Sequence, residues 1–243
     1  MTVRESVLRY GASSWHRIHL YSPSKDPVES RVVLFHGGFW RHDRVARDLG
    51  PLAMELTRRG RAAAVVEYRP VWDGGSWPGA VEDCAAALDA LAAQDAAWLT
   101  AVLAGHSAGA QLALAAVAGR SAGHRLVLLA PVVHLERAVE LGVGGGAVQH
   151  FVSRHLAAGG SYADATPQPD TADVAWLAVV EAGCDQAVPA ELTAHQLDRW
   201  RTAGLAPEHR VVPDARHMHL VNPARPGCAT SLELLTSVAG ART

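Results

Sequence analysis

The feature of the sequence that most constrains the fold is the pentapeptide at residues 105–109, which reads Gly-His-Ser-Ala-Gly. An apolar run precedes it at residues 100–104, and an apolar, helix-prone run follows it at residues 111–117. This order predicts a buried strand, a sharp turn and a helix. Because glycine has no Cβ atom, the two glycines allow the strand and the helix to approach closely. We therefore expect Ser107 to lie on a strained turn and to project alone above the edge of a sheet.

A second glycine turn, His-Gly-Gly-Phe-Trp at residues 36–40, directly follows another strand-like run at residues 31–35. A serine nucleophile needs hydrogen-bond donors for the oxyanion of its tetrahedral intermediate, and a Gly-Gly turn lets backbone N–H groups approach that oxygen. We expect the backbone N–H groups of Gly38, Phe39 and Ala108 to form this oxyanion hole. The alternative, two unrelated glycine turns, is less favoured because each motif follows a predicted strand.

Strand-like and helix-like segments alternate along the chain, which is typical of an α/β fold with a mostly parallel twisted sheet flanked by helices. We expect a single domain at residues 1–243, with a small cap insertion at residues 132–173, where the alternation breaks down around the glycine-rich run 142–146. The predicted strands are residues 14–21, 31–35, 62–67, 100–104, 125–131, 176–180 and 209–212. The predicted helices are residues 45–59, 79–94, 111–117, 148–157, 190–204 and 231–238.

The composition indicates a small molecule as the binding partner. The 243 residues carry a net charge of −2 with both signs interspersed, so neither nucleic acid nor an anionic membrane is indicated. No apolar run reaches the length of a membrane span, and the first ten residues lack the apolar core of a signal peptide. The scattered histidines show no metal-ligand spacing, so we expect no metal and no cofactor. Whether the chain is a monomer or a homodimer stays open.

The cysteines bear on the cellular compartment. Cys84, Cys184 and Cys228 are odd in number, widely separated and outside any metal-like Cys-x-x-Cys spacing. This pattern is typical of reduced thiols, and we therefore expect a cytoplasmic protein.

The acid that would support Ser107 is sought in the second half of the chain. A serine hydroxyl is a weak nucleophile at neutral pH and needs a base that is oriented by a buried carboxylate. We call the strand–turn–helix junction at residues 105–109 the elbow, and on a fold with this elbow the chain order is serine, acid, histidine. Asp185 lies in the loop after the predicted strand 176–180 and is our candidate acid, although an ordinary turn aspartate would show the same spacing. Asp170, Asp173 and Glu181 fit this position less well.

The base is expected in the loop after the last predicted strand. His217 and His219 both lie there, and spacing alone leaves the choice between them open. We expect His36 to brace the oxyanion turn through its ring, and we take the other histidines, His106 among them, as isolated surface residues. Trp40 is our candidate substrate-binding residue, with packing in the core as an equally favoured alternative.

These motifs resemble those of the α/β-hydrolases, and within them of the esterase and lipase group that includes the arylformamidases, or kynurenine formamidases. The turn at residues 36–40 is similar to the HGGxW motif of that group, and Glu-Tyr-Arg at residues 67–69 is similar to its (N/E)YR segment. Residues 182–189 resemble its acid motif, GxxDxxVP, and put Asp185 in the place of the acid.

The last motif of this group, HFxxxDP, resembles residues 217–223 and places His217 on the catalytic histidine. Met218 stands where the motif has an aromatic residue, and Asn222 stands where it has aspartate. The resemblance therefore implies that Ser107, Asp185 and His217 act together.

What the resemblance implies is a serine hydrolase that cleaves a small carboxylic ester or amide through an acyl-enzyme on Ser107. An N-formyl aryl amide such as N-formylkynurenine is the favoured substrate. The same residues would serve a generalist carboxylesterase, or a biosynthetic thioesterase or acyltransferase. A non-catalytic ligand-binding protein of the same fold is a further alternative. Covalent labelling by a fluorophosphonate probe separates it from an enzyme, because only an activated serine reacts.

Overall fold

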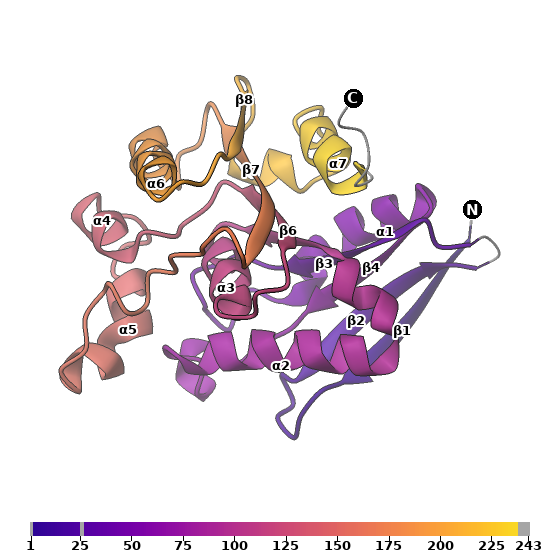
Figure 1. Ribbon diagram of the computed structural model, residues 1–243, viewed down its shortest axis with the longest axis horizontal. Helices are drawn as coiled ribbons and strands as arrows, with labels where there is room; N and C mark the ends of the chain where they lie inside the picture. Colours follow the sequence, from indigo (N-terminus) through magenta and orange to yellow (C-terminus); the bar gives the residue numbers. More distant parts are fainter. Residues whose placement is uncertain (1, 25–26, 238–243) are drawn as a thin grey trace.

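The computed structural model describes residues 2–24 and 27–237 of the chain. Within these residues the centre of the fold is an eight-stranded sheet with the order β1-β2-β4-β3-β5-β6-β7-β8 (Figure 1). Strands β3 to β8 are parallel to one another, whereas β2 runs antiparallel to both β1 and β4. The strands are β1 (Val3–Arg9), β2 (Arg17–Pro23), β3 (Ser30–Phe35), β4 (Arg61–Val66), β5 (Val102–His106), β6 (His124–Leu129), β7 (Val174–Ala182) and β8 (Glu208–Val212).

Helices cover both faces of this sheet (Figure 1). The α-helices are α1 (Gly50–Arg58), α2 (Gly79–Gln94), α3 (Ala108–Val117), α4 (Leu135–Glu140), α5 (Ala147–Ala157), α6 (Ala190–Thr202) and α7 (Cys228–Thr236). Short 3-10 helices lie at Ala46–Leu49, Val71–Asp73, Ala96–Thr100 and His217–Leu220. In the part of the chain that the structure describes, no helix combines the length and the apolar character that crossing a membrane requires.

The parallel strands send alternate side chains into two separate cores. In β3, Val33 and Phe35 belong to the hydrophobic cluster that includes residues of α2 and α3, whereas Val32 and Leu34 belong to the cluster that includes residues of α1 and α7. This division follows from the period of two along a strand. Strands that are buried on both faces read as continuous apolar runs, which explains why the sequence pattern locates them.

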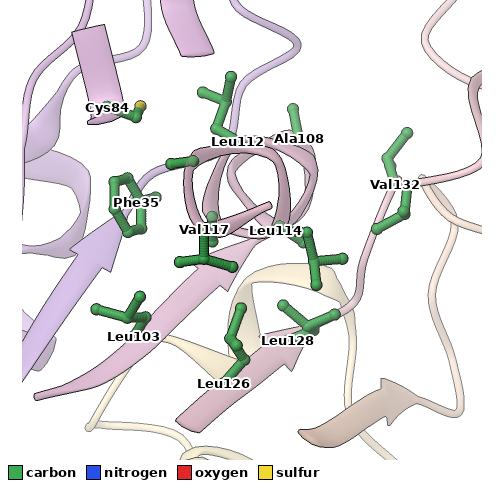
Figure 2. Packing of buried hydrophobic residues seen from close by; sticks show 14 of the residues in the cluster. Phe35, Cys84, Leu103, Ala108, Leu112, Leu114, Val117, Leu126, Leu128 and Val132 are labelled. Carbon is green, nitrogen blue, oxygen red and sulfur yellow. The ribbon is translucent and has the colours of Figure 1, made fainter. Parts of the chain in front are cut away.

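Helix α3, which follows the predicted elbow, packs in the core between the sheet and α2 (Figure 2). Its residues Leu112, Leu114 and Val117 are fully buried, and Leu103 of β5 and Leu128 of β6 belong to the same cluster. Burying an aliphatic side chain of this size contributes about 1.5–3 kcal/mol relative to leaving it exposed. These contacts hold the N-terminus of α3, and with it the preceding turn, firmly against the sheet.

The expectation of a mostly parallel sheet flanked by helices is confirmed. The six predicted strands from 31–35 to 209–212 start and end within two residues of observed strands. Strand β1 was not predicted, and β2 begins three residues after the start of the predicted strand 14–21. The side chains of β1 are mostly exposed, so its sequence lacks the apolar pattern that marks a buried strand.

Several helix predictions also differ from the structure at their ends. The predicted helix 111–117 corresponds to α3, which begins three residues earlier, and the predicted helix 190–204 corresponds to α6, which ends two residues earlier. The predicted helix 45–59 is divided into a 3-10 helix, Ala46–Leu49, and α1, because Pro51 lies in the first turn of α1 and favours a helix start there. The predicted helix 231–238 corresponds to α7, and its last residue lies outside the described residues.

Between β6 and β7 the chain forms α4, which was not predicted, and α5, which matches the predicted helix 148–157. Val148, Phe151 and Val152 of α5 are buried in the same cluster as α2 and α3. The backbone N–H of Trp77 donates to the carbonyl oxygen of Phe151 at 2.9 Å. Part of the predicted insertion is therefore packed against the main core, while four of the five residues in the loop 142–146 are glycines with positive φ.

Candidate active site

Ser107 lies at the junction of β5 and α3 in a strained backbone conformation, with φ 55° and ψ −121°. A Cβ atom at Gly105 would overlap with the backbone of Ala110, and one at Gly109 would overlap with the carbonyl oxygen of Phe35. Both glycines are therefore required by close backbone approach. A residue held in such a conformation costs about 1–3 kcal/mol, which the buried surroundings of the turn must offset.

Asp185 and His217 form a hydrogen-bonded pair beside this turn, with 2.7 Å between Asp185 Oδ2 and His217 Nδ1. Asp185 follows β7 and His217 follows β8, so the two loops meet at the carboxyl edge of the sheet. The other carboxylate oxygen, Oδ1, accepts hydrogen bonds from the N–H groups of Ala187 at 2.8 Å and Val188 at 3.0 Å. The carboxylate is thus fixed on both sides and aligns the imidazole.

The environment favours the ionised form of Asp185. Burial raises the pKa of this carboxyl, since its side chain is only 4% exposed, but the hydrogen bond and charge of His217 and the N–H groups of Val188 and Ala187 outweigh burial and lower the pKa below its usual range. A carboxylate bonded to Nδ1 leaves Nε2 as the nitrogen that exchanges protons with a substrate-side hydroxyl.

The structure brings His217, and not His219, to Asp185. Among the described residues, no hydrogen bond or ion pair involves the side chain of His219. The other acidic candidates have separate partners. Asp170 and Asp173 accept hydrogen bonds from backbone N–H groups in turns, and Glu181 pairs with His209 at 3.2 Å.

Ser107 and His217 both line a cavity of about 310 Å³. Within residues 2–24 and 27–237, no hydrogen bond joins the Ser107 hydroxyl to the His217 ring. Catalytic hydrogen bonds are often long or poorly aligned in a protein without substrate, so a shared cavity is the informative relation here.

The predicted oxyanion turn lies directly against the elbow. A Cβ atom at Gly37 would be 2.8 Å from Ser107 Cβ. The next three residues have positive φ, with 106° at Gly38, 54° at Phe39 and 56° at Trp40. In the described part of the chain, the N–H groups of Gly38, Phe39 and Ala108 donate no hydrogen bond to the protein. They are available to an oxyanion, and the N-terminus of α3 adds a favourable dipole at Ala108.

His36 is bonded on both ring nitrogens. Nδ1 lies 2.8 Å from the carbonyl oxygen of Gly37, and Nε2 lies 3.0 Å from Glu67 Oε1. The ring also stacks on Tyr68 with 4.3 Å between centroids, and the Tyr68 hydroxyl donates to the carbonyl oxygen of His36 at 2.8 Å. The second carboxylate oxygen of Glu67 accepts from the N–H of Ala46 at 3.0 Å. This buried network braces the turn, as expected for His36.

Sequence reasoning did not single out Glu67 as the partner of His36. The signal was strand order, because β3 and β4 are parallel neighbours that pair Phe35 with Val66. The residues that follow these two positions, His36 and Glu67, therefore emerge side by side at the carboxyl edge of the sheet.

The sequence suggested that His106 is a surface residue, and this prediction is wrong. Its side chain is buried, and its ring lies 4.6 Å from the ring of His217. Burial, together with the neighbouring charge of His217, lowers the pKa of His106 to about 3. The ring is neutral at ordinary pH, and Nε2 lies 3.3 Å from the carbonyl oxygen of His217. His106 thus supports the backbone of the residue that pairs with Asp185.

Of the two alternatives for Trp40, substrate contact and packing in the core, the structure shows packing in the core. Its side chain is 0% exposed and stacks on Phe151 of α5, with 4.1 Å between ring centroids and 3° between planes. The core takes this ring because Phe151 offers a flat apolar partner. Phe39 lines the cavity instead. Among the described residues, no group of three or more His, Cys, Asp or Glu side chains is arranged to hold a metal ion.

Comparison with known proteins is consistent with this geometry. The model of a family described as BD-FAE matches residues 18–146, more than half of the chain, and this region includes both glycine motifs. No curated protein matches the chain.

Among solved structures, esterase B from Lactobacillus Rhamnosis has a TM-score of 0.77 and 18% identity, covering 96% of this chain and 84% of that one. Carboxyl esterase 2 from the mycorrhizal fungus Tuber melanosporum has a TM-score of 0.74 and 18% identity, with coverages of 96% and 84%. Esterase 2 from Thermogutta terrifontis has a TM-score of 0.71 and 19% identity, with coverages of 95% and 91%. This likeness shows the α/β-hydrolase fold, and the family match shows that the chain belongs to the BD-FAE family.

Proposed function

We propose that the protein is a serine hydrolase that cleaves small carboxylic esters through an acyl-enzyme on Ser107. The observation that carries this proposal is that the strained Ser107 lines one cavity together with His217, whose ring is hydrogen-bonded to Asp185. The similar structures named above are called esterases, which supports the reaction class.

The reaction begins when Ser107 Oγ attacks the ester carbonyl carbon and its proton passes to His217 Nε2. Asp185 stabilises the imidazolium that forms. The carbonyl oxygen becomes an oxyanion between the N–H groups of Ala108, Phe39 and Gly38. Collapse of this intermediate breaks the C–O bond, and His217 returns the proton to the leaving alcohol. Water, deprotonated by His217, then releases the carboxylic acid and restores the serine.

An N-formyl aryl amide such as N-formylkynurenine is the second candidate substrate. Arg44 and Asp48 line the same cavity as Ser107, so the cavity presents a cation and an anion to an amino-acid group that carries a carboxylate and an ammonium. A formyl group is also the smallest acyl group, and it needs little space beside the oxyanion hole.

The first experiment is labelling with a fluorophosphonate, with Ser107→Ala as the control. We expect the wild-type protein to be labelled and the variant to be unlabelled. An unlabelled wild-type protein would instead indicate a binding protein that kept the fold. Turnover of p-nitrophenyl butyrate compared with N-formylkynurenine then decides between the two substrate classes, and turnover of an acyl thioester tests the thioesterase alternative.

A further inference from the structure

The ring of Phe39 lies where three cavities meet. The inner cavity of about 310 Å³ contains Ser107. One outer cavity of about 300 Å³ is lined by Trp72 and His150, and another of about 360 Å³ is lined by Leu141 and Pro189. Phe39 lines all three. Arg41 is shared by the inner and the first outer cavity and Ala187 by the inner and the second, but Phe39 is the one described lining residue common to all three. Phe39 therefore lies between the space around the nucleophile and about twice as much space outside it.

We propose that Phe39 determines which esters the protein accepts, because its ring closes the inner cavity and Gly144 holds the ring in place. This inference rests on the proposed function. With the ring in place, the acyl group must fit within the inner cavity, so the substrate class is esters of short acyl chains. Removing the ring joins the inner cavity to the outer ones and admits long acyl chains.

The backbone of Phe39 is fixed, so its ring is the adjustable part. Its φ is 54°, and its chain neighbours Gly38 and Trp40 also have positive φ. Trp40 is anchored in the core by its stacking on Phe151, which fixes the direction in which the neighbouring Phe39 side chain leaves the turn. The Phe39 ring itself is only half-buried and meets Trp40 edge-on at 6.4 Å.

Gly144 supports the ring from the side of the loop 142–146. A Cβ atom at Gly144 would be 2.7 Å from Phe39 Cε1 and 2.8 Å from Cδ1, which is closer than Cβ atoms come to other carbons. Gly144 lines both outer cavities and does not line the inner one. A side chain at this position would therefore push the ring away from the outer cavities and toward Ser107, which reduces the inner cavity.

The same loop offers a matched control at Gly145. Its φ of 56° is also positive, so alanine brings comparable backbone strain, but no atom lies within 4 Å of a Cβ built there. Gly144→Ala and Gly145→Ala thus differ in one respect, the contact with Phe39.

The test measures kcat/KM for p-nitrophenyl acetate, butyrate and octanoate. We expect Phe39→Ala to raise the octanoate-to-acetate ratio by about tenfold or more, since a buried methylene changes discrimination by at least this order. Gly144→Ala should lower the butyrate-to-acetate ratio several-fold, and Gly145→Ala should leave it unchanged. Gly144→Ala combined with Phe39→Leu should restore the ratio, because the shorter side chain relieves the contact. A wild-type profile in both Phe39→Ala and Gly144→Ala would overturn the inference.

A binding experiment distinguishes this failure from failure of the proposed function. Calorimetry of butyrate and octanoate is performed on Ser107→Ala with and without Phe39→Ala, so that no turnover is needed. A gain in octanoate affinity of about tenfold on removing the ring supports the role of Phe39 in closing the inner cavity, even if the wild-type protein hydrolyses no ester. Equal chain-length preference in the two proteins overturns the role of Phe39 in closing the inner cavity, even if hydrolysis is observed.

Discussion

The elbow and the loop 142–146 are both rich in glycine, but for different physical reasons. Gly105 and Gly109 are needed because strand β5, helix α3 and the backbone at the end of β3 approach one another too closely for a Cβ atom. Gly142, Gly145 and Gly146 have positive φ and open space around them. The first kind of glycine positions a nucleophile in a packed core, and the second shapes a loop at the surface. The same composition therefore predicts different sensitivity to substitution.

The largest contrast between the two regions is expected from Ser107→Ala. Removing the nucleophile should lower kcat by about 10⁶-fold, as in comparable triads, while the far-UV circular dichroism and unfolding midpoint stay close to wild type. Gly145→Ala, in the other region, should retain kcat on p-nitrophenyl acetate. Activity near wild type in Ser107→Ala would remove Ser107 from the mechanism and, with it, the functional meaning of the elbow.

The next prediction concerns the base. His217→Ala should be nearly as damaging as Ser107→Ala, because His217 holds the hydrogen bond to Asp185 and lines the cavity with Ser107. His219→Ala is the matched control from the same short helix, and its loss of kcat should be far smaller. The reverse order of the two variants would transfer the role of base to His219.

Substitution of the two kinds of glycine tests the comparison directly. Gly109→Ala should lower the free energy of unfolding by about 3 kcal/mol, since its Cβ would overlap with backbone atoms of Phe35 and His36 at the end of β3. Gly145→Ala should cost about 1 kcal/mol, the strain of a positive φ without a clash. Urea unfolding of both variants checks this order. Equal losses would show that crowding at the elbow is relieved by small backbone shifts.

Much of the fold could be predicted because buried parallel strands have continuous apolar sequences. The elbow could be predicted because its glycines and serine are adjacent in the chain. The choice between His217 and His219 could not be made from spacing, since it depends on how the loops after β7 and β8 meet. The burial of His106 and the Glu67 partner of His36 were missed because neither follows from local sequence. Both result from strand order and side-chain packing.

Gly38→Val tests the oxyanion turn. We expect kcat to fall by about 10²-fold, the scale of losing one oxyanion donor. The structure adds two reasons for the effect. Gly38 has φ 106°, which valine rarely adopts, and a Cβ there would overlap with the Arg44 side chain. The unfolding midpoint is measured with kcat. Unchanged kcat, or a loss explained by unfolding alone, would make residues 36–40 a structural turn only.

The last prediction is a pH dependence of stability that originates at His106. Its pKa is about 3 in the folded protein and 6.5 in the reference state, so unfolding takes up a proton when the pH lies between these values. Stability is therefore lost as the pH falls from 6.5 toward 3, by about 2 kcal/mol at pH 5 relative to pH 7.

In His106→Gln the side-chain amide still donates toward the His217 carbonyl but does not titrate. We expect this variant to lose less stability than wild type over the same window in urea unfolding. Equal slopes in the two proteins would show that His106 is hydrated and titrates normally. The elbow would then be open to water at the residue before Ser107, and its packed character, which distinguishes it from the loop 142–146, would not extend to the nucleophile.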